Sequence, residues 1–172
     1  MKIETIETER LYLRGFEKED ADFAISIWND PEMGEDLGDP TLDHVDEAYR
    51  KSIEALGENK TCCYLISESK AGKERIGTCS FIPRQDGKVY DDIAYCVHKK
   101  YWRNGYATEM VKGMVDYARG QGAEKITVSI DQANAASNAV VRKLGFTVAS
   151  EDTYRKRGTD RVSAEYRYEL IL

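Results

Sequence analysis

The sequence has no long hydrophobic run, and no uninterrupted apolar stretch approaches the roughly 18 residues of a membrane-spanning helix. The opening segment MKIETIETER, residues 1–10, also lacks the apolar core of a secretory signal peptide. We therefore expect a soluble, cytoplasmic protein that does not insert into a membrane.

Histidine and cysteine are scarce as well. The chain has 2 histidines, His44 and His98, and 4 cysteines, Cys62, Cys63, Cys79 and Cys96, with no CxxC pair. This spacing forms no metal-binding motif, and each cysteine lies in an apolar, strand-like run where a thiol behaves as a small hydrophobic group. We expect reduced cysteines in the core and no bound metal.

What is present fits a single globular domain over residues 1–172. Hydrophobic residues make up 41% of the chain and charged residues 33%, and we find no repeat, linker or low-complexity segment. A chain of this length buries about two-thirds of the surface that its unfolded form exposes. The formal net charge of -6 disfavours a general affinity for nucleic acid or anionic membranes and slightly favours a cationic partner.

Hydrophobic periodicity predicts the order of the secondary-structure elements. Strands are expected at 10–16, 61–68, 75–82, 89–97, 126–130, 146–155 and 162–172, and helices at 21–28, 45–56, 107–118 and 135–144. Asp86-Gly87 is a hairpin-turn signal, and Gly120, Gly122 and Gly145 mark helix ends. This order predicts an α/β (α+β) fold in which a mixed sheet of about seven strands carries helices on its faces.

The stretch YWRNGYATEM at 101–110 stands where a strand ends and a helix begins. The first backbone N–H groups of a helix have no partner within it, and together they attract an anion. Gly105 lets the backbone approach a ligand closely, Ala107 leaves room, and nearby basic residues add positive charge: Lys99, Lys100 and Arg103. A diphosphate fits such a site, although neither GxxxxGK[ST] nor GxGxxG occurs at this turn.

This stretch resembles the acyl-CoA signature Q/R-x-x-G-x-G/A of the GNAT N-acetyltransferases. Gly105 and Ala107 match the signature, whereas Trp102 occupies the position of Gln or Arg. The same departure is usual in the branch that resembles the ribosomal-protein N-terminal acetyltransferases. Three more segments are similar to that branch: TERLYLRGFEKEDADF at 8–23, DDIAYCVHKKYW at 91–102 and NAASNAVVRKLGF at 134–146.

The resemblance implies a mostly antiparallel sheet with helices on both faces, splayed central strands and acetyl-CoA as co-substrate. In this family the turn before the third helix binds the pyrophosphate, and the preceding strand holds the pantetheine through its backbone. The residues implied in cofactor binding are Ala94, Tyr95, Cys96, Val97, Trp102, Arg103, Asn104, Gly105, Tyr106, Ala107, Thr108, Asn134 and Ser137.

Catalytic roles follow from the same resemblance. The amine must lose a proton, and we assign this step to Asp92, where the family often carries Glu; Asp91 would face the other side of the strand as a solvated charge. Many relatives protonate the leaving thiolate with a Tyr at the position of Val141. Ser137 would take that role here, or would simply cap the short helix. The oxyanion would be met by a backbone N–H near Tyr95.

The acceptor is the least determined part. Trp28, Tyr49 and Tyr64 either line an acceptor pocket or belong to the core, and the acidic loop 32–39 either attracts a cation through Glu35, Asp36 and Asp39 or is an ordinary solvated loop.

The leading hypothesis is transfer of an acetyl group to a primary amine: a protein N-terminus, a polyamine or a small amino compound. The alternative is a non-catalytic module that binds acyl-CoA. A homodimer is possible, because the tyrosine-rich segment AEYRYELIL at 164–172 would either pair with another chain or close the sheet.

Overall fold

One eight-stranded sheet organises the protein in the computed structural model, which describes residues 3–172. The strands are β1 (Ile6–Glu7), β2 (Leu11–Gly15), β3 (Cys63–Ser69), β4 (Arg75–Pro83), β5 (Val89–Val97), β6 (Lys125–Asp131), β7 (Thr147–Arg155) and β8 (Val162–Ile171). Their order is β1-β2-β3-β4-β5-β6-β8-β7, and every neighbouring pair except β5–β6 is antiparallel.

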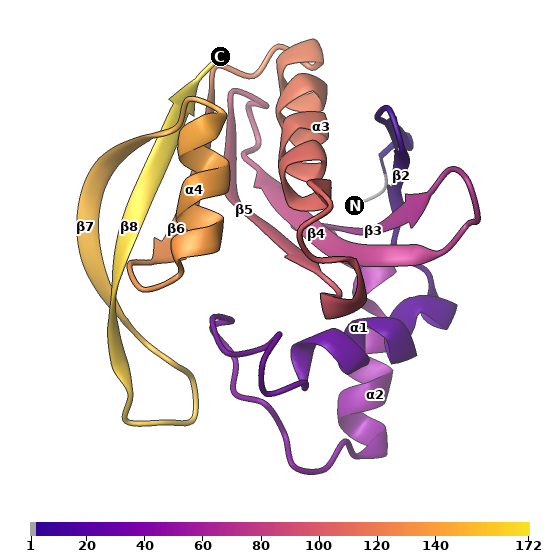
Figure 1. Ribbon diagram of the computed structural model, residues 1–172. Coiled ribbons are helices and arrows are strands. Elements are labelled where there is room, and N and C mark those ends of the chain that lie inside the picture. The colour runs from indigo at the N-terminus through magenta and orange to yellow at the C-terminus, as the bar shows by residue number, and fades with distance from the viewer. Residues whose placement is uncertain (1–2) are drawn as a thin grey trace.

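Helices cover both faces of this sheet (Figure 1). The α-helices are α1 (Ala21–Trp28), α2 (Glu47–Glu54), α3 (Tyr106–Gly120) and α4 (Ala135–Lys143), and three short 3₁₀ turns are η1 (Lys18–Asp20), η2 (Leu56–Glu58) and η3 (Lys99–Tyr101). On β3, Leu65 packs with α3 in the larger core, whereas its neighbour Ile66 packs with α1 and α2. Because successive strand residues point to opposite faces, α3 and α1–α2 lie on opposite sides of the sheet.

The apolar stripes of the sequence account for this packing. On α3, the predicted stripe is buried, with Met110, Val111, Met114 and Ala118 at 1% exposure or less. On β2, Leu11 and Leu13 are fully buried, whereas Tyr12 and Arg14 between them are partly exposed, as alternation requires.

The two halves of the sheet separate between β5 and β6. Only two registered pairs join these parallel strands, Val89 with Lys125 and Tyr90 with Ile126. Immediately afterwards β5 bulges, and Asp92 takes a left-handed φ of 44°. The strands then diverge, with α3 over one half and α4 over the other, and both helices begin at the open end of the resulting gap (Figure 1). This β5–β6 gap is the expected splay of the central strands.

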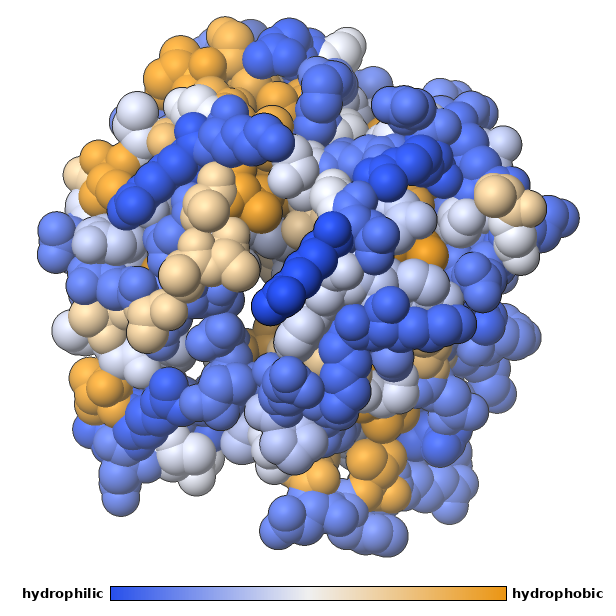
Figure 2. Space-filling model, viewed as in Figure 1, coloured by the Kyte–Doolittle hydropathy of each residue, from blue (hydrophilic) through white to orange (hydrophobic). Residues whose placement is uncertain are grey.

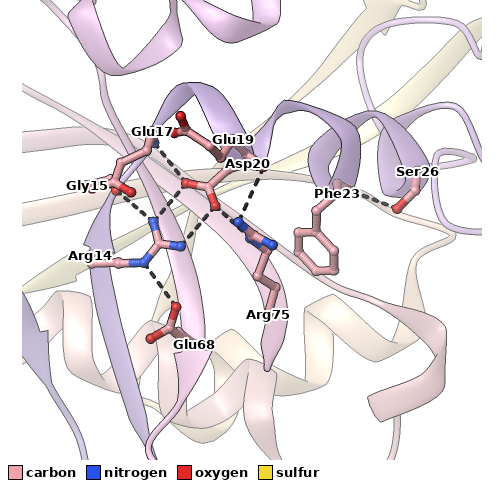
Figure 3. Close-up of polar contacts among 9 residues, drawn as sticks. All are labelled: Arg14, Gly15, Glu17, Glu19, Asp20, Phe23, Ser26, Glu68 and Arg75. Carbon is pink, nitrogen blue, oxygen red and sulfur yellow. Dashed lines mark hydrogen bonds and ion pairs between the residues drawn. The ribbon is translucent and has the colours of Figure 1, made fainter. Parts of the chain in front are cut away.

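A buried carboxylate joins α1 to the sheet. Asp20 has no exposed surface and binds the Arg14 guanidinium of β2 at 2.8 and 2.9 Å and Arg75 Nε of β4 at 2.7 Å (Figure 3). The backbone N–H of Glu17 donates to the same carboxylate at 2.8 Å. Asp20 therefore fixes the start of α1 against two strands.

The predicted fold is confirmed, with small differences. The sheet has eight strands rather than seven, because the two-residue strand β1 is too short to produce an alternating pattern. Strand β8 pairs with β6 on one side and β7 on the other, so the tyrosine-rich segment closes the sheet and leaves β7 as the edge. No helix within residues 3–172 is long and apolar enough to cross a membrane.

Candidate functional site

The turn into α3 presents a row of free backbone amides. Arg103 and Gly105 have left-handed φ values of 62° and 79°, and the first helical bond runs from the Glu109 N–H to the Gly105 carbonyl at 3.1 Å. Within residues 3–172, the N–H groups of residues 103–108 have no hydrogen-bond acceptor. We call these six groups the α3 amide cluster; such a concave row of N–H groups binds anions.

Side chains stabilise this turn by hydrogen bonds to its carbonyl groups, and none of them uses the N–H groups of the α3 amide cluster. Arg10 donates from Nη1 to the Asn104 carbonyl at 3.0 Å, pairs through Nε with Glu109 at 2.7 Å and lies 4.4 Å from the Tyr106 ring centre. The Asn104 side chain donates to the carbonyls of Tyr101 and Trp102. Sequence reasoning gave Arg10 no role, because the partners are about a hundred residues further along the chain.

Of the three basic residues predicted near this turn, two form ion pairs with carboxylates and one does not. Lys99 pairs with Asp30 at 2.6 Å, and Lys100 lies 3.7 Å from Glu74. Arg103 makes no ion pair with any residue of the described chain. The positive charge available to an anion at the α3 amide cluster is therefore that of Arg103.

Strand β5 turns part of its backbone towards the gap. The His98 N–H donates to the Ile76 carbonyl at 2.9 Å, so alternation directs the backbone of Cys96 and Ala94 to β4 and that of Val97 and Tyr95 to the gap. The Val97 carbonyl already accepts from Trp102 Nε1 at 2.6 Å. The Trp102 side chain thus links the turn to β5, and the free groups are the Val97 N–H and both backbone groups of Tyr95.

The start of α4 forms the opposite side of the gap. Asn134 Oδ1 accepts from the Ser137 N–H at 2.9 Å, so Asn134 is the helix cap, and the capping role considered for Ser137 is wrong. The Ser137 side chain lies close to the Tyr95 hydroxyl, where its hydrogen bond lowers the pKa of Tyr95 by less than burial raises it. Across the gap, the Tyr95 hydroxyl donates to the Ser137 carbonyl at 3.2 Å. Burial raises the pKa of Tyr95 to about 12, which keeps this hydroxyl a donor at neutral pH.

Asp92 lies at the closed end of the gap, but regular alternation of side chains along β5 does not set its orientation. The bulge after Tyr90 interrupts the alternation, and the Asp92 N–H donates to Thr127 Oγ1 on β6 at 3.1 Å. The Asp92 side chain is exposed and makes no ion pair within the described residues. Asp91 is not a solvated charge: it pairs with Arg84 at 2.6 Å, which lowers the pKa of its carboxyl.

A second carboxylate, Glu165, belongs to the same region and was missed from the sequence. It lies opposite Asp131 and Asp152 in the register of β8 with its neighbours. Burial raises the pKa of Glu165, and the negative charges of Asp152 and Asp92 raise it further. The only sequence signal was the alternation of polar and aromatic residues along 165–170. Within residues 3–172, no group of three or more His, Cys, Asp and Glu side chains could hold a metal ion.

A cavity of about 470 Å³ lies on the α1–α2 face of the sheet. Trp28, Tyr49 and Tyr64 all line it, so these aromatics form a pocket wall. The cavity reaches β5 at Ala94, Tyr95 and Cys96, which are residues implied in cofactor binding. Figure 2 shows that the viewed face is hollowed near its centre, below α4 and above the loop that follows α1.

The acidic loop 32–39 carries less free charge than its sequence suggests. Glu35 pairs with Arg161, and Asp39 pairs with Arg157 at 3.1 Å. Asp36 makes no such pair within residues 3–172. Its side chain is exposed, but partial loss of hydration and the nearby charge of Asp131 raise the pKa of its carboxyl. Both arginines come from the β7–β8 hairpin, which therefore holds this loop over the cavity.

Comparison with known proteins places the whole arrangement in one family. A model of the acetyltransferase (GNAT) domain matches residues 10–147. The uncharacterized N-acetyltransferase p20 of Bacillus licheniformis is 29% identical over 98% of this chain and 97% of its own.

Two solved structures share the fold at low identity. The spermidine N-acetyltransferase of Vibrio cholerae, solved with CoA and spermine, has a TM-score of 0.78 at 16% identity and covers 94% of this chain and 95% of its own. The acetyltransferase of Salmonella typhimurium that modifies the N-terminal serine of ribosomal protein L7/L12 has a TM-score of 0.79 at 19% identity, covering 98% and 99%. The chain belongs to the GNAT family of acetyltransferases.

Proposed function

We propose that this protein transfers the acetyl group of acetyl-CoA to a primary amine, which attacks the thioester directly within a ternary complex. The observation that carries this proposal is the continuity of the α3 amide cluster with the open edge of β5 through the Trp102–Val97 hydrogen bond. An anion site and an adjacent free strand edge are the two features that a diphosphate joined to an amide-containing arm requires.

The residues around the turn fit coenzyme A. The α3 amide cluster and Arg103 would bind the pyrophosphate. The Val97 N–H and the Tyr95 carbonyl would pair with the amides of the pantetheine arm, and Asn134, which caps α4 on the other side of the gap, would offer its side-chain NH₂. When bound, acetyl-CoA supplies the activated thioester, whose carbonyl would lie near the Tyr95 N–H.

The base and the acid would come from different elements around the gap, with Asp92 on β5, Glu165 on β8 and Ser137 on α4. An alkylamine is mostly protonated at neutral pH, so a carboxylate must accept its proton directly or through water. We assign this to Asp92 together with Glu165, because Glu165 lies near the charges of Asp92 and Asp152 and its raised pKa favours uptake of a proton. The Ser137 hydroxyl would donate to the leaving thiolate, and the Tyr95 hydroxyl would hold Ser137 in place through the Ser137 carbonyl.

Thiol release tests this proposal. The protein is incubated with acetyl-CoA and a panel of primary amines, and free coenzyme A is measured over time. We expect release that depends on the amine and saturates with its concentration. Tight binding of coenzyme A without release on any amine would contradict catalysis and favour the alternative, a module that binds acyl-CoA without turning it over.

A further inference from the structure

The wall of the cavity on the α1–α2 face is apolar and aromatic. Its main contributors are Phe16, Trp28, Leu37, Tyr49, Leu56 and Tyr64. They come from the α1–α2 region, the loop over the cavity and strand β3, so a ligand there would be surrounded by side chains rather than lie on a flat surface. Such a wall favours binding of an apolar group, because binding removes apolar surface from water.

Charge is nearly absent from this wall. The lining contains no Lys, Arg or His, and its single carboxylate, Asp39, is already paired with Arg157. A linear polyamine that placed its ammonium groups in the cavity would find no unpaired carboxylate among the lining residues, because Asp36 is not one of them. Burial of an unpaired charge is strongly unfavourable.

Two polar groups on the wall already have hydrogen-bond partners. The Trp28 indole donates to Thr78 Oγ1 at 3.2 Å, and the Tyr49 hydroxyl accepts from Asn29 Nδ2 at 3.3 Å. Burial raises the pKa of Cys96 to about 12, so this thiol is neutral where the cavity meets β5. The Trp28 and Tyr49 groups therefore already have partners, and most of the surface that lines the cavity is apolar.

Hydrogen bonds from the β7–β8 hairpin fix the position of loop 32–39 over the cavity. Lys156 is 7% exposed and donates from Nζ to the carbonyls of Gly34 at 3.2 Å and Glu35 at 2.8 Å. The Arg157 N–H donates to the Gly38 carbonyl at 3.0 Å. A volume of about 470 Å³ lies within the range of small-ligand sites, and a fixed loop leaves little room for the continuing chain of a polypeptide.

From these observations, and resting on the proposed function, we infer that the acceptor is a small primary amine that carries one apolar, ring-sized group. The ring occupies the cavity among Trp28, Tyr49 and Tyr64, and the amino group points to β5, where the cavity reaches Ala94 and Cys96. A polyamine or a protein N-terminus is a poorer fit to the same site.

A matched set of amines tests the inference. Thiol release from acetyl-CoA is measured with 2-phenylethylamine, ethylamine, spermidine and a short peptide with a free N-terminal serine. We expect kcat/KM for 2-phenylethylamine to exceed each of the others by at least tenfold. An equal or higher value for spermidine, for the peptide or for ethylamine would overturn the inference.

A variant locates the effect in the cavity. Tyr49→Ala removes one ring of the wall and should lower kcat/KM for 2-phenylethylamine at least tenfold more than it lowers kcat/KM for ethylamine. Tyr12→Ala, which removes a ring from β2 outside the lining, serves as the control and should leave kcat/KM for both amines unchanged. An equal loss for both amines in Tyr49→Ala would mean that the ring does not contact the acceptor.

A binding measurement separates failure of the inference from failure of the proposed function. The chain has 2 tryptophans, and only Trp28 lines the cavity. With coenzyme A present, 2-phenylethylamine should change the fluorescence saturably in the unaltered protein and not in Trp28→Phe. Such binding without thiol release on any amine would refute acyl transfer and leave the pocket assignment standing, whereas no change at millimolar amine would overturn the assignment.

Discussion

Asp20 illustrates how much one buried side chain can fix. Burial by itself would raise the pKa of this carboxyl, but hydrogen bonds from Arg14, the Glu17 N–H and Arg75 lower it below the ordinary value. The charge is therefore retained in the interior, where three donors compensate for lost hydration. Because its partners lie on β2 and β4, the carboxylate positions the helix that supplies Trp28 to the cavity.

We predict that Asp20→Asn lowers the free energy of unfolding at pH 7 by about 3–5 kcal/mol, since two arginines lose their shared counter-charge. The lowered pKa means that the charge stabilises the fold above about pH 4, the ordinary range of Asp, and that this contribution is lost as the pH falls through the native pKa. Denaturant unfolding of both proteins should therefore converge in acid.

Asp22→Asn is the matched control. Asp22 lies two residues further on and pairs with Arg50 at the surface, where an ion pair contributes at most about 1 kcal/mol. A loss in Asp20→Asn no larger than in Asp22→Asn would contradict the role given to the buried network.

Glu165 leads to a prediction about pH. Because its pKa is raised, the carboxylate that accepts the proton is lost as the pH falls through that raised value, and kcat should fall with it. Glu165→Gln should lower kcat by about 10²- to 10⁴-fold and remove this limb of the profile. Asp92→Asn removes a negative charge that raises the pKa of Glu165. In this variant the remaining activity should therefore decline at a lower pH than in the unaltered protein.

Glu169→Gln provides the comparison, because Glu169 lies on the same face of β8 and pairs with Lys125 at 3.5 Å. If Glu165→Gln retained the full rate and the same pH profile as Glu169→Gln, the base would have to be Asp92 alone or water.

At the scale of elements, α3 shows that the ends of a helix can serve different purposes. Gly105 and Gly122, at its two ends, both adopt left-handed backbone with φ of 79° and 81°. A Cβ at Gly105 would meet only Arg10 Nη2, at 3.6 Å, and one at Gly122 would meet nothing within 4 Å. The two positions therefore differ little in space and backbone strain, but only Gly105 belongs to the α3 amide cluster.

This pair yields a matched experiment. Gly105→Val and Gly122→Val should each cost about 1–3 kcal/mol of folding free energy for the strained backbone. Only Gly105→Val should abolish binding of coenzyme A, measured by calorimetry on the folded protein. Unchanged affinity in Gly105→Val would contradict the assignment of the turn as the pyrophosphate site.

Regular elements were predictable from the sequence because their apolar periods are long. Helix α1 matches the predicted bounds, and β4 and β5 match within one residue. Strand β1 was not predictable from two residues, nor was the bulge at Asp92, because polar residues at a strand end carry no periodic signal. The turn before α3 was foreseen as a local feature, whereas Arg10 and Glu165 join the site only through tertiary packing.

At the scale of the whole molecule, the sheet consists of two halves whose strands are joined by only two registered pairs, those of β5 with β6. Strands β1–β5 form one half and β6–β8 the other. Besides the two registered β5–β6 pairs, hydrogen bonds join the halves from the Asp92 N–H to Thr127, from the Tyr95 hydroxyl to Ser137, and from Lys156 to the loop after α1. A ligand that fills the gap contacts both halves, and a ligand that binds only the native state stabilises it by mass action.

Coenzyme A should therefore stabilise the entire fold, and the size of the effect can be calculated. At 100 times its dissociation constant, it would add about 2.7 kcal/mol, which for a chain of this length raises Tm by about 5–11 °C. Pantetheine lacks the pyrophosphate and cannot use the α3 amide cluster, so at the same concentration it should raise Tm by less than about 1 °C. Thermal unfolding followed by circular dichroism measures both shifts. Equal stabilisation by the two compounds would mean that the amides at the start of α3 contribute nothing to binding, and the site would then lie along β5 alone.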